Sequence, residues 1–231
     1  MTSDRIPGAH ADQAARTSAI VFDLGGVLID WNPRYLYRDL FRGDEQAMEW
    51  FLASVCTPEW NLHQDRGRPF ADGIAELVSH FPDHEHLIRA YRDRWHEMIG
   101  GPIEETVGVL AELHTDAWPL YALTNWSAET FALARDDFDF LGWFRGIVVS
   151  GQERVTKPDE RIFRILLERY HLTPAEAIYI DDVRANVETA GQLGMDTILY
   201  MDGTDLRAQL TRRGFLDGRP RGAGVSVGPA G

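Results

Sequence analysis

The chain has 231 residues, of which 44% are hydrophobic, enough for one large globular domain or a domain with a sizeable insertion. Its net charge is −13, from 36 acidic and 23 basic residues, with no block of lysine or arginine. This balance argues against sequence-independent binding to nucleic acid, which requires basic side chains at the phosphates. No apolar run approaches the ~20 residues of a membrane span. We therefore expect neither a nucleic-acid nor a membrane partner, and no feature specifies an oligomeric state.

The single cysteine and the two ends of the chain carry little chemistry. Cys56 has no partner for an internal disulfide, which favours a reducing, cytoplasmic setting, and it is interpreted as a small buried side chain. Residues 1–17 lack the apolar centre of a signal peptide and predict a flexible arm. Residues 216–231 predict a flexible tail.

After the arm, short apolar strands alternate with helices. The first strand is "AIVFD", residues 19–23, a continuous apolar run typical of a strand covered on both faces. Later strands are predicted at 119–125, 146–150, 177–182 and 197–200, with helices near 103–110, near 163–170 and up to Leu193. "TPAE", Thr173–Glu176, has the form of a capping box with proline at the first helical position. The alternation predicts an α/β fold with a doubly wound, Rossmann-like parallel sheet.

Some seventy residues after the first strand show no further strand pattern. Helical spacing is present at 44–55, 69–81 and 84–99, with Asp83 as the expected N-cap of the last helix. Between two of these helices, Glu59 to Phe70 is expected to be a polar and aromatic loop that reaches toward the sheet. We expect a core of residues 18–33 and 100–215, and a helical cap of residues 34–99 over the carboxyl edge of the sheet, where such folds bind ligands.

Four polar signals lie at or just beyond the ends of predicted strands: Asp23, Thr124-Asn125, Lys157 and Asp181-Asp182. Each alone is commoner as a turn or a helix cap. The carboxyl ends of parallel strands converge on one crevice, so the four signals are expected to share one site.

The chemistry of these groups is coherent. Three carboxylates held together raise one another's pKa unless cations compensate, and Mg²⁺ with one lysine supplies that compensation. Asp23 is then placed to ligate the ion with one oxygen and attack with the other. The carbonyl of Gly25 is free to ligate the metal, and Gly26 lets the backbone approach the substrate closely.

The remaining groups suit a phosphoryl substrate. The hydroxyl of Thr124 and the amide of Asn125 are donors for phosphoryl oxygens, and Lys157 supplies positive charge to the transition state. Mg²⁺ itself commonly binds substrate phosphate. The sequence therefore favours a phosphate ester as the substrate.

The stretches "FDLGGVL", "LTNWS", "VTKPDERIF" and "IDDVRANVETAGQLGM" resemble the four motifs of the haloacid dehalogenase (HAD) superfamily, and the likeness runs from about Ala19 to Thr204. The superfamily places a helical cap after its first motif. Within it, the pattern is most similar to sugar-phosphate phosphatases and to the phosphatase domain of soluble epoxide hydrolases. The resemblance implies a magnesium-dependent phosphatase of small phosphomonoesters that works through an aspartyl-phosphate.

The resemblance also assigns roles to single residues. It implies that Asp23 is the covalent nucleophile and that Thr124, with its neighbour in the motif, holds the phosphoryl group. Lys157 bridges nucleophile and phosphate. Asp182 is the direct magnesium ligand, with Asp181 close by or acting through water.

Gly25 departs from the usual phosphatase pattern. Most phosphatases of the superfamily carry an aspartate here, which protonates the leaving group and then activates water. True dehalogenases also lack that acid and need no metal, so Gly25 favours a metal-independent 2-haloacid dehalogenase, whereas Asp181-Asp182 favours the phosphatase. We give the pair more weight, because uncompensated buried acids are costly. A non-catalytic binding protein of the same fold is the third alternative, against which the intact Asp23 and Lys157 argue.

Two positions are candidates for the missing acid. Asp30 stands seven residues after the nucleophile, where some sugar-phosphate phosphatases with a "DLG" motif carry an aspartate; a plain turn residue is its alternative. The other position is in the cap near Asp65. Without any acid, good leaving groups such as phenols and sugar-1-phosphates are expected to be preferred over sugar-6-phosphates.

Substrate contacts are expected from the cap and from the loop after the second motif. Trp60 and Trp126 are candidates to stack on a sugar face, and Arg34 and Arg66 to meet a second anionic group. Ordinary core packing for the tryptophans and a solvated surface for the arginines are the alternatives.

Overall fold

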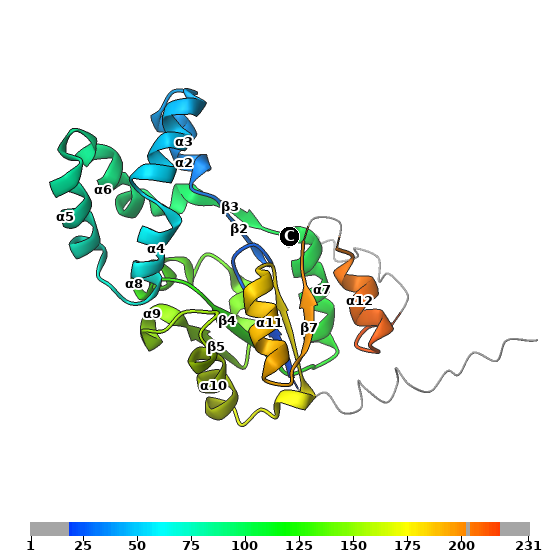
Figure 1. Ribbon diagram of the computed structural model, residues 1–231. Helices are drawn as coiled ribbons and strands as arrows, with labels where there is room; N and C mark the ends of the chain where they lie inside the picture. Colours follow the sequence, from blue (N-terminus) through cyan, green and yellow to red (C-terminus); the bar gives the residue numbers. More distant parts are fainter. Residues whose placement is uncertain (1–18, 202–203, 218–231) are drawn as a thin grey trace, which may run out of the picture.

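The computed structural model describes residues 19–201 and 204–217 (Figure 1). The predicted arm, residues 1–17, and residues 218–231 of the predicted tail lie outside this range. The predicted start of the flexible tail at residue 216 is wrong, because Leu216 is buried in the main apolar cluster. The preceding Phe215 packs edge-on against Trp118 and accepts a hydrogen bond from its indole N–H at 3.1 Å, which anchors this end of the chain.

The core is a parallel five-stranded sheet in the order β5-β4-β1-β6-β7, as the alternation of strands and helices predicts. Its strands are β1 (Ala19–Phe22), β4 (Leu120–Thr124), β5 (Gly146–Val149), β6 (Ala177–Asp181) and β7 (Asp196–Leu199). Every residue of β1, β4 and β6 is buried. These three central strands therefore read as continuous apolar runs.

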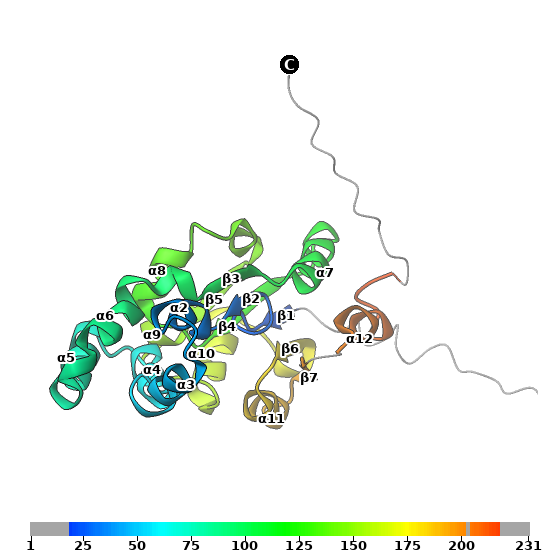
Figure 2. The same cartoon turned by 90° about the horizontal axis from the view of Figure 1, so that it is seen from above.

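Helices cover both faces of the sheet (Figure 2). Phe22 of β1 belongs to the apolar cluster that includes α7 (Glu104–Thr115) and α12 (Leu206–Arg212). The neighbouring Val21 belongs to a second cluster, formed with α10 (Glu160–Arg169) and α11 (Arg184–Gln192). Successive strand residues thus face opposite layers, as the period of two requires. The remaining core elements are α8 (Ala128–Ala134), η3 (Asp139–Trp143), α9 (Ser150–Glu153) and the 3₁₀ turn η4 (Pro174–Glu176).

A group of helices lies beyond the carboxyl edge of the sheet (Figure 1). It contains α2 (Arg34–Leu40), α3 (Glu45–Ser54), α4 (Pro58–Asp65), α5 (Phe70–His80), η1 (Pro82–His84), α6 (Glu85–Asp93) and η2 (Trp95–Met98). The sequence predicts no strand in this region, and this prediction is wrong. The chain enters the helical group through β2 (Ile29–Trp31) and leaves it through β3 (Ile99–Pro102), and these two strands pair antiparallel. Strands of three and four residues are too short to show a period of two.

Three local predictions in this region and beyond it are also corrected. The expected loop from Glu59 is mostly the helix α4, which Thr57 caps by accepting from the N–H of Trp60 at 3.1 Å. Asp83 is not the N-cap of α6, because it lies within the 3₁₀ turn η1. Thr173 opens only the 3₁₀ turn η4 and makes no side-chain cap bond, since β6 begins immediately afterwards. Across the described residues, no helix is long and apolar enough to cross a membrane.

Candidate active site

The sheet register brings the first acid next to the acidic pair. Phe22, the last residue of β1, stands opposite Ile180 of β6 and Ala122 of β4. The next backbone N–H, that of Asp23, donates to the carbonyl of Ile180 at 2.8 Å. Asp23 and Asp181 therefore emerge side by side at the carboxyl edge of the sheet.

Lys157 joins these two acids from a loop between α9 and α10. Its ammonium Nζ lies 2.8 Å from Oδ2 of Asp23 and 2.7 Å from Oδ2 of Asp181, and it also donates to the carbonyl of Leu123 at 2.9 Å. The lysine side chain is buried, with a relative exposure of 1%. A buried ammonium with three oxygen partners is a fixed positive charge and not a surface lysine.

Asn125 fixes the loop that carries the lysine. Its side-chain oxygen accepts from the backbone N–H of Lys157 at 2.8 Å, and its amide nitrogen donates to the Lys157 carbonyl at 3.1 Å. The sequence predicts Asn125 as a phosphoryl donor, whereas the structure engages both ends of its amide in positioning Lys157. The peptide bond between Lys157 and Pro158 is cis.

Asp181 is held by residues that the sequence analysis did not single out. Its carboxylate accepts from the backbone N–H of Val183 at 2.7 Å, from the amide of Asn186 at 3.0 Å and from the hydroxyl of Tyr179. Tyr179 precedes it by two positions on the buried strand and therefore shares its face, and Asn186 lies on the first turns of α11. The spacing of Tyr179 and Asn186 from Asp181 is the only feature of the sequence from which these two contacts could have been predicted.

The three acids form a possible metal centre. Carboxylate oxygens of Asp23, Asp181 and Asp182 lie within 4.8 Å of one another. Oxygen ligands in this number and spacing fit Mg²⁺, which keeps several waters of its own. Gly26 has a φ of +72°, and a Cβ there would lie 2.3 Å from Oδ2 of Asp182. The glycine thus provides the room in which the Asp182 carboxylate lies.

The electrostatics also favour a cation. Burial raises the pKa of Asp23 to about 8, a rise opposed by Lys157 and increased by Asp181. Burial also raises the pKa of Asp182, and the neighbouring Asp181 adds to the rise. Burial acts on Asp181 in the same direction, but Lys157 and the hydrogen bonds outweigh it and hold the pKa of this carboxyl below its usual value. A divalent cation would favour the ionised form of all three.

The ammonium of Lys157 stays protonated in this setting. Burial disfavours the charged form, but the carboxylates of Asp181 and Asp23 outweigh it and raise the pKa of the lysine. One ammonium against three carboxylates leaves the site short of positive charge.

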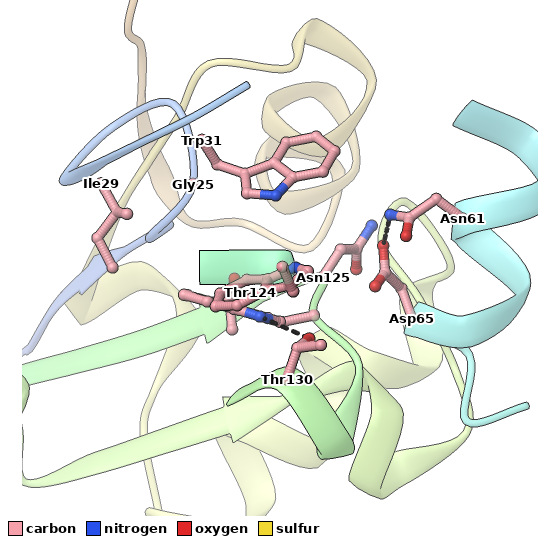
Figure 3. Close-up of a pocket in the computed structure, with 10 residues that line it drawn as sticks. Gly25, Ile29, Trp31, Asn61, Asp65, Thr124, Asn125 and Thr130 are labelled. Atoms are coloured by element: carbon pink, nitrogen blue, oxygen red, sulfur yellow. Dashed lines mark hydrogen bonds between the residues drawn. The ribbon is translucent and has the colours of Figure 1, made fainter. Parts of the chain in front are cut away.

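A pocket continues from these residues toward the helical group (Figure 3). Its lining includes three tryptophans together with the polar side chains of Asn61 and Asp65 from α4. The lining residues are Gly25, Ile29, Trp31, Asn61, Asp65, Trp95, Thr124, Asn125, Trp126 and Thr130. The cavity over Asp23 and Lys157 shares Gly25, Trp31, Thr124 and Asn125 with this pocket, so the pocket lies between the acids and α4.

Asp30 does not line this space. It is the middle residue of β2, whose flanking residues Ile29 and Trp31 line the pocket. Its carboxylate instead accepts from the hydroxyl of Tyr35 at 2.6 Å and packs over Gly100 of β3. The prediction of Asp30 as a surrogate acid is therefore wrong, because alternation along the strand aims it away from the site.

The predicted substrate contacts divide in the same way. Trp126 lines the pocket, with its indole N–H bound to Thr130 at 3.1 Å. Trp60 is core, because it is buried against Phe70 and donates to the Gly73 carbonyl at 3.1 Å.

The two arginines are engaged elsewhere. Arg34 forms an exposed ion pair with Glu49 and lines neither of the two cavities described above, which favours the alternative of a solvated surface. Arg66 donates to the hydroxyl of Thr156 at 3.1 Å, next to Lys157, and so ties the end of α4 to the core.

The fold and the site together define a class, a doubly wound α/β protein with an acidic, lysine-bridged centre at the carboxyl edge of its sheet. The sequence pattern of the haloacid dehalogenase-like hydrolases matches residues 17–194. The chain belongs to this family and is an enzyme, a hydrolase.

Its relatives include phosphatases of different substrates. The sesquiterpene phosphatase astK of Aspergillus oryzae is 28% identical, over 77% of this chain and 86% of its own length. The D-ribitol-5-phosphate phosphatase of Bacteroides thetaiotaomicron is 24% identical, over 83% and 96%.

The solved structures agree on the fold. The HAD family enzyme bt-2542 of Bacteroides thetaiotaomicron, in complex with magnesium and inorganic phosphate, has a TM-score of 0.65 at 21% identity, covering 84% of this chain and 98% of its own. Dehalogenases share the fold as well.

Proposed function

We propose that this hydrolase is a magnesium-dependent phosphatase of small phosphomonoesters, with Asp23 as its covalent nucleophile. The observation that carries the proposal is the buried contact of Lys157 with Asp23 beside a cluster of three carboxylates. In this site, Mg²⁺ would be held by Asp23 and Asp182, with Asp181 acting through Lys157 or through water. Oδ1 of Asp23 accepts from the N–H of Leu24 at 2.7 Å and Oδ2 from Lys157, and each oxygen keeps a second lone pair for the ion. The bound ion supplies positive charge to the phosphoryl oxygens.

The residues of the chain divide the reaction between them. A carboxylate oxygen of Asp23 attacks phosphorus, the bond to the leaving oxygen breaks, and an aspartyl-phosphate results. The hydroxyl of Thr124 would donate to a phosphoryl oxygen, and Lys157, whose N–H groups are engaged by Asp23, Asp181 and the Leu123 carbonyl, supplies positive charge as charge develops. Water then attacks phosphorus, the bond to Asp23 breaks, and inorganic phosphate leaves.

Gly25 keeps a metal-independent 2-haloacid dehalogenase as the second candidate function, because that chemistry needs no acid at this position. The three carboxylates weigh against it, since a single lysine leaves them undercompensated. A non-catalytic binding protein would have no use for a buried lysine held against the nucleophile.

The aromatic pocket is proposed as the place of the leaving group. Indole rings such as Trp31 and Trp126 present flat apolar faces, which suit an aromatic, isoprenoid or sugar ring. The relatives act on substrates as different as a sesquiterpene and a ribitol phosphate, so we keep the substrate class broad, with sugar-1-phosphates still a prediction. A cytoplasmic setting likewise stays a prediction. Burial raises the pKa of the Cys56 thiol to about 12, so this thiol is unreactive at neutral pH.

Metal dependence separates the candidates. Hydrolysis of p-nitrophenyl phosphate should fall to background in EDTA and return when Mg²⁺ is added in excess, and the Asp23→Asn variant should be inactive throughout. Release of halide from a 2-haloacid at full rate in EDTA would instead establish the dehalogenase. Absence of both activities would contradict both candidate functions.

A further inference from the structure

The pocket beside Gly25 contains one acid that the steps above do not use. Asp65 is the last residue of α4, and among the ten described residues that line this pocket it alone has an acidic side chain. Its carboxyl group points into the pocket on the side of Asn125 (Figure 3). The space between Asp65 and the phosphoryl site is where the leaving group of a bound ester would lie.

Hydrogen bonds fix the Asp65 side chain without neutralising it. Oδ2 accepts from the amide of Asn61, one turn earlier on α4, at 3.0 Å, and the backbone N–H of Ser127 also donates to the carboxyl group. None of the salt bridges found in the described part of the chain involves Asp65. Burial raises the pKa of this carboxyl to about 7, so its protonated and ionised forms are both populated near neutral pH.

The end of α4 is also held against the core. The hydroxyl of Ser150, which begins α9, donates to the Asp65 carbonyl at 2.6 Å and accepts from the N–H of Trp126 at 2.9 Å. Arg66 adds its bond to Thr156. Asp65 therefore has a defined position relative to the sheet edge, although it comes from the helical group.

Gly25 leaves room for such a group. A Cβ at this position would meet no atom within 4 Å, so the usual acid is missing without another side chain having filled its place. On the basis of the proposed phosphatase function, we infer that Asp65 is the general acid and base of the reaction. The helical group thus supplies the proton donor that the first motif lacks.

The proton balance uses one carboxyl group twice. As the bond from phosphorus to the ester oxygen breaks, protonated Asp65 gives its proton to that oxygen and an alcohol leaves. The Asp65 carboxylate then takes a proton from the water that attacks the aspartyl-phosphate. Inorganic phosphate and a free Asp23 result, and Asp65 is protonated again. Both steps occur on the side of phosphorus opposite Asp23, because the leaving oxygen and the attacking water lie in line with the bond between Asp23 and phosphorus.

The test compares two esters in single-turnover rapid-quench experiments that follow phosphoenzyme formation. p-Nitrophenyl phosphate has a leaving group that needs no proton, whereas 2-phenylethyl phosphate is an alkyl ester of similar size. Asp65→Asn should slow phosphoryl transfer from the alkyl ester by ~10²–10⁴-fold and change transfer from the aryl ester only a few-fold. Turnover of the aryl ester should still slow after the burst, because water activation is lost. Glu59→Gln, an exposed acid on the same helix, should reproduce neither effect.

Distinct outcomes separate this inference from the proposed function. The intact aryl burst in Asp65→Asn shows that the variant is folded, and Gly25→Asp added to it should recover alkyl cleavage at least tenfold. Equal effects of Asp65→Asn on the two esters, or no recovery with Gly25→Asp, would overturn the role of Asp65 alone. A wild-type enzyme that forms no phosphoenzyme from either ester would overturn the phosphatase function and this inference with it.

Discussion

Adjacent glycines have different roles in the first motif. Gly26 takes a left-handed backbone conformation and lies against Asp182, whereas Gly25 takes neither a positive φ nor a crowded position. The glycine pair in "FDLGGVL" thus combines a required backbone position with an open one. From the sequence alone the two are equivalent, because φ and the direction of a missing Cβ are set by the fold.

Alanine at each glycine tests this difference. Gly26→Ala should displace the Asp182 carboxylate and lower the affinity for Mg²⁺ at least tenfold in titration calorimetry, or ~1.4 kcal/mol. Because an L residue is strained at a left-handed φ, the same variant should also lower the free energy of unfolding by roughly 1–2 kcal/mol. Gly25→Ala, the matched control, should leave the magnesium affinity and the stability close to wild type. Equal magnesium affinities in the two variants would show that Asp182 is not a ligand.

Among the elements, α4 links the helical group to the sheet. Its start carries a sequence signal that the analysis passed over: Thr57 caps the helix and Pro58 occupies the first helical position. Its end reaches the core through Ser150, which is fully buried. No local pattern announces that contact, since the two residues are far apart in the chain.

Removal of the Ser150 hydroxyl tests how much this contact contributes. Ser150→Ala leaves the buried N–H of Trp126 without an acceptor, which should cost about 1–3 kcal/mol in urea unfolding. Ser79→Ala removes an exposed hydroxyl bonded to the Glu76 carbonyl and should change stability by less than ~0.5 kcal/mol. Similar losses in the two variants would mean that the contact between α4 and the core adds nothing.

At the scale of the whole molecule, the central sheet could be predicted from the sequence, whereas the contacts between the helical group and the sheet could not. Continuous apolar runs locate β1, β4 and β6, and polar residues at their ends locate Asp23, Thr124 and Asp181. The ribbon of β2 and β3 decides which side chains of the entry segment face the site. It turns Trp31 toward the pocket and Asp30 away, a choice that no spacing from Asp23 could reveal.

The central claim concerns Asp23, and mass spectrometry of the acid-quenched enzyme tests it most directly. With p-nitrophenyl phosphate and Mg²⁺, the account predicts a phosphoryl group on the peptide that contains Asp23, its loss in Asp23→Asn, and its loss in EDTA. Phosphate on another residue, or steady turnover with no phosphoenzyme in rapidly quenched samples, would contradict Asp23 as the nucleophile.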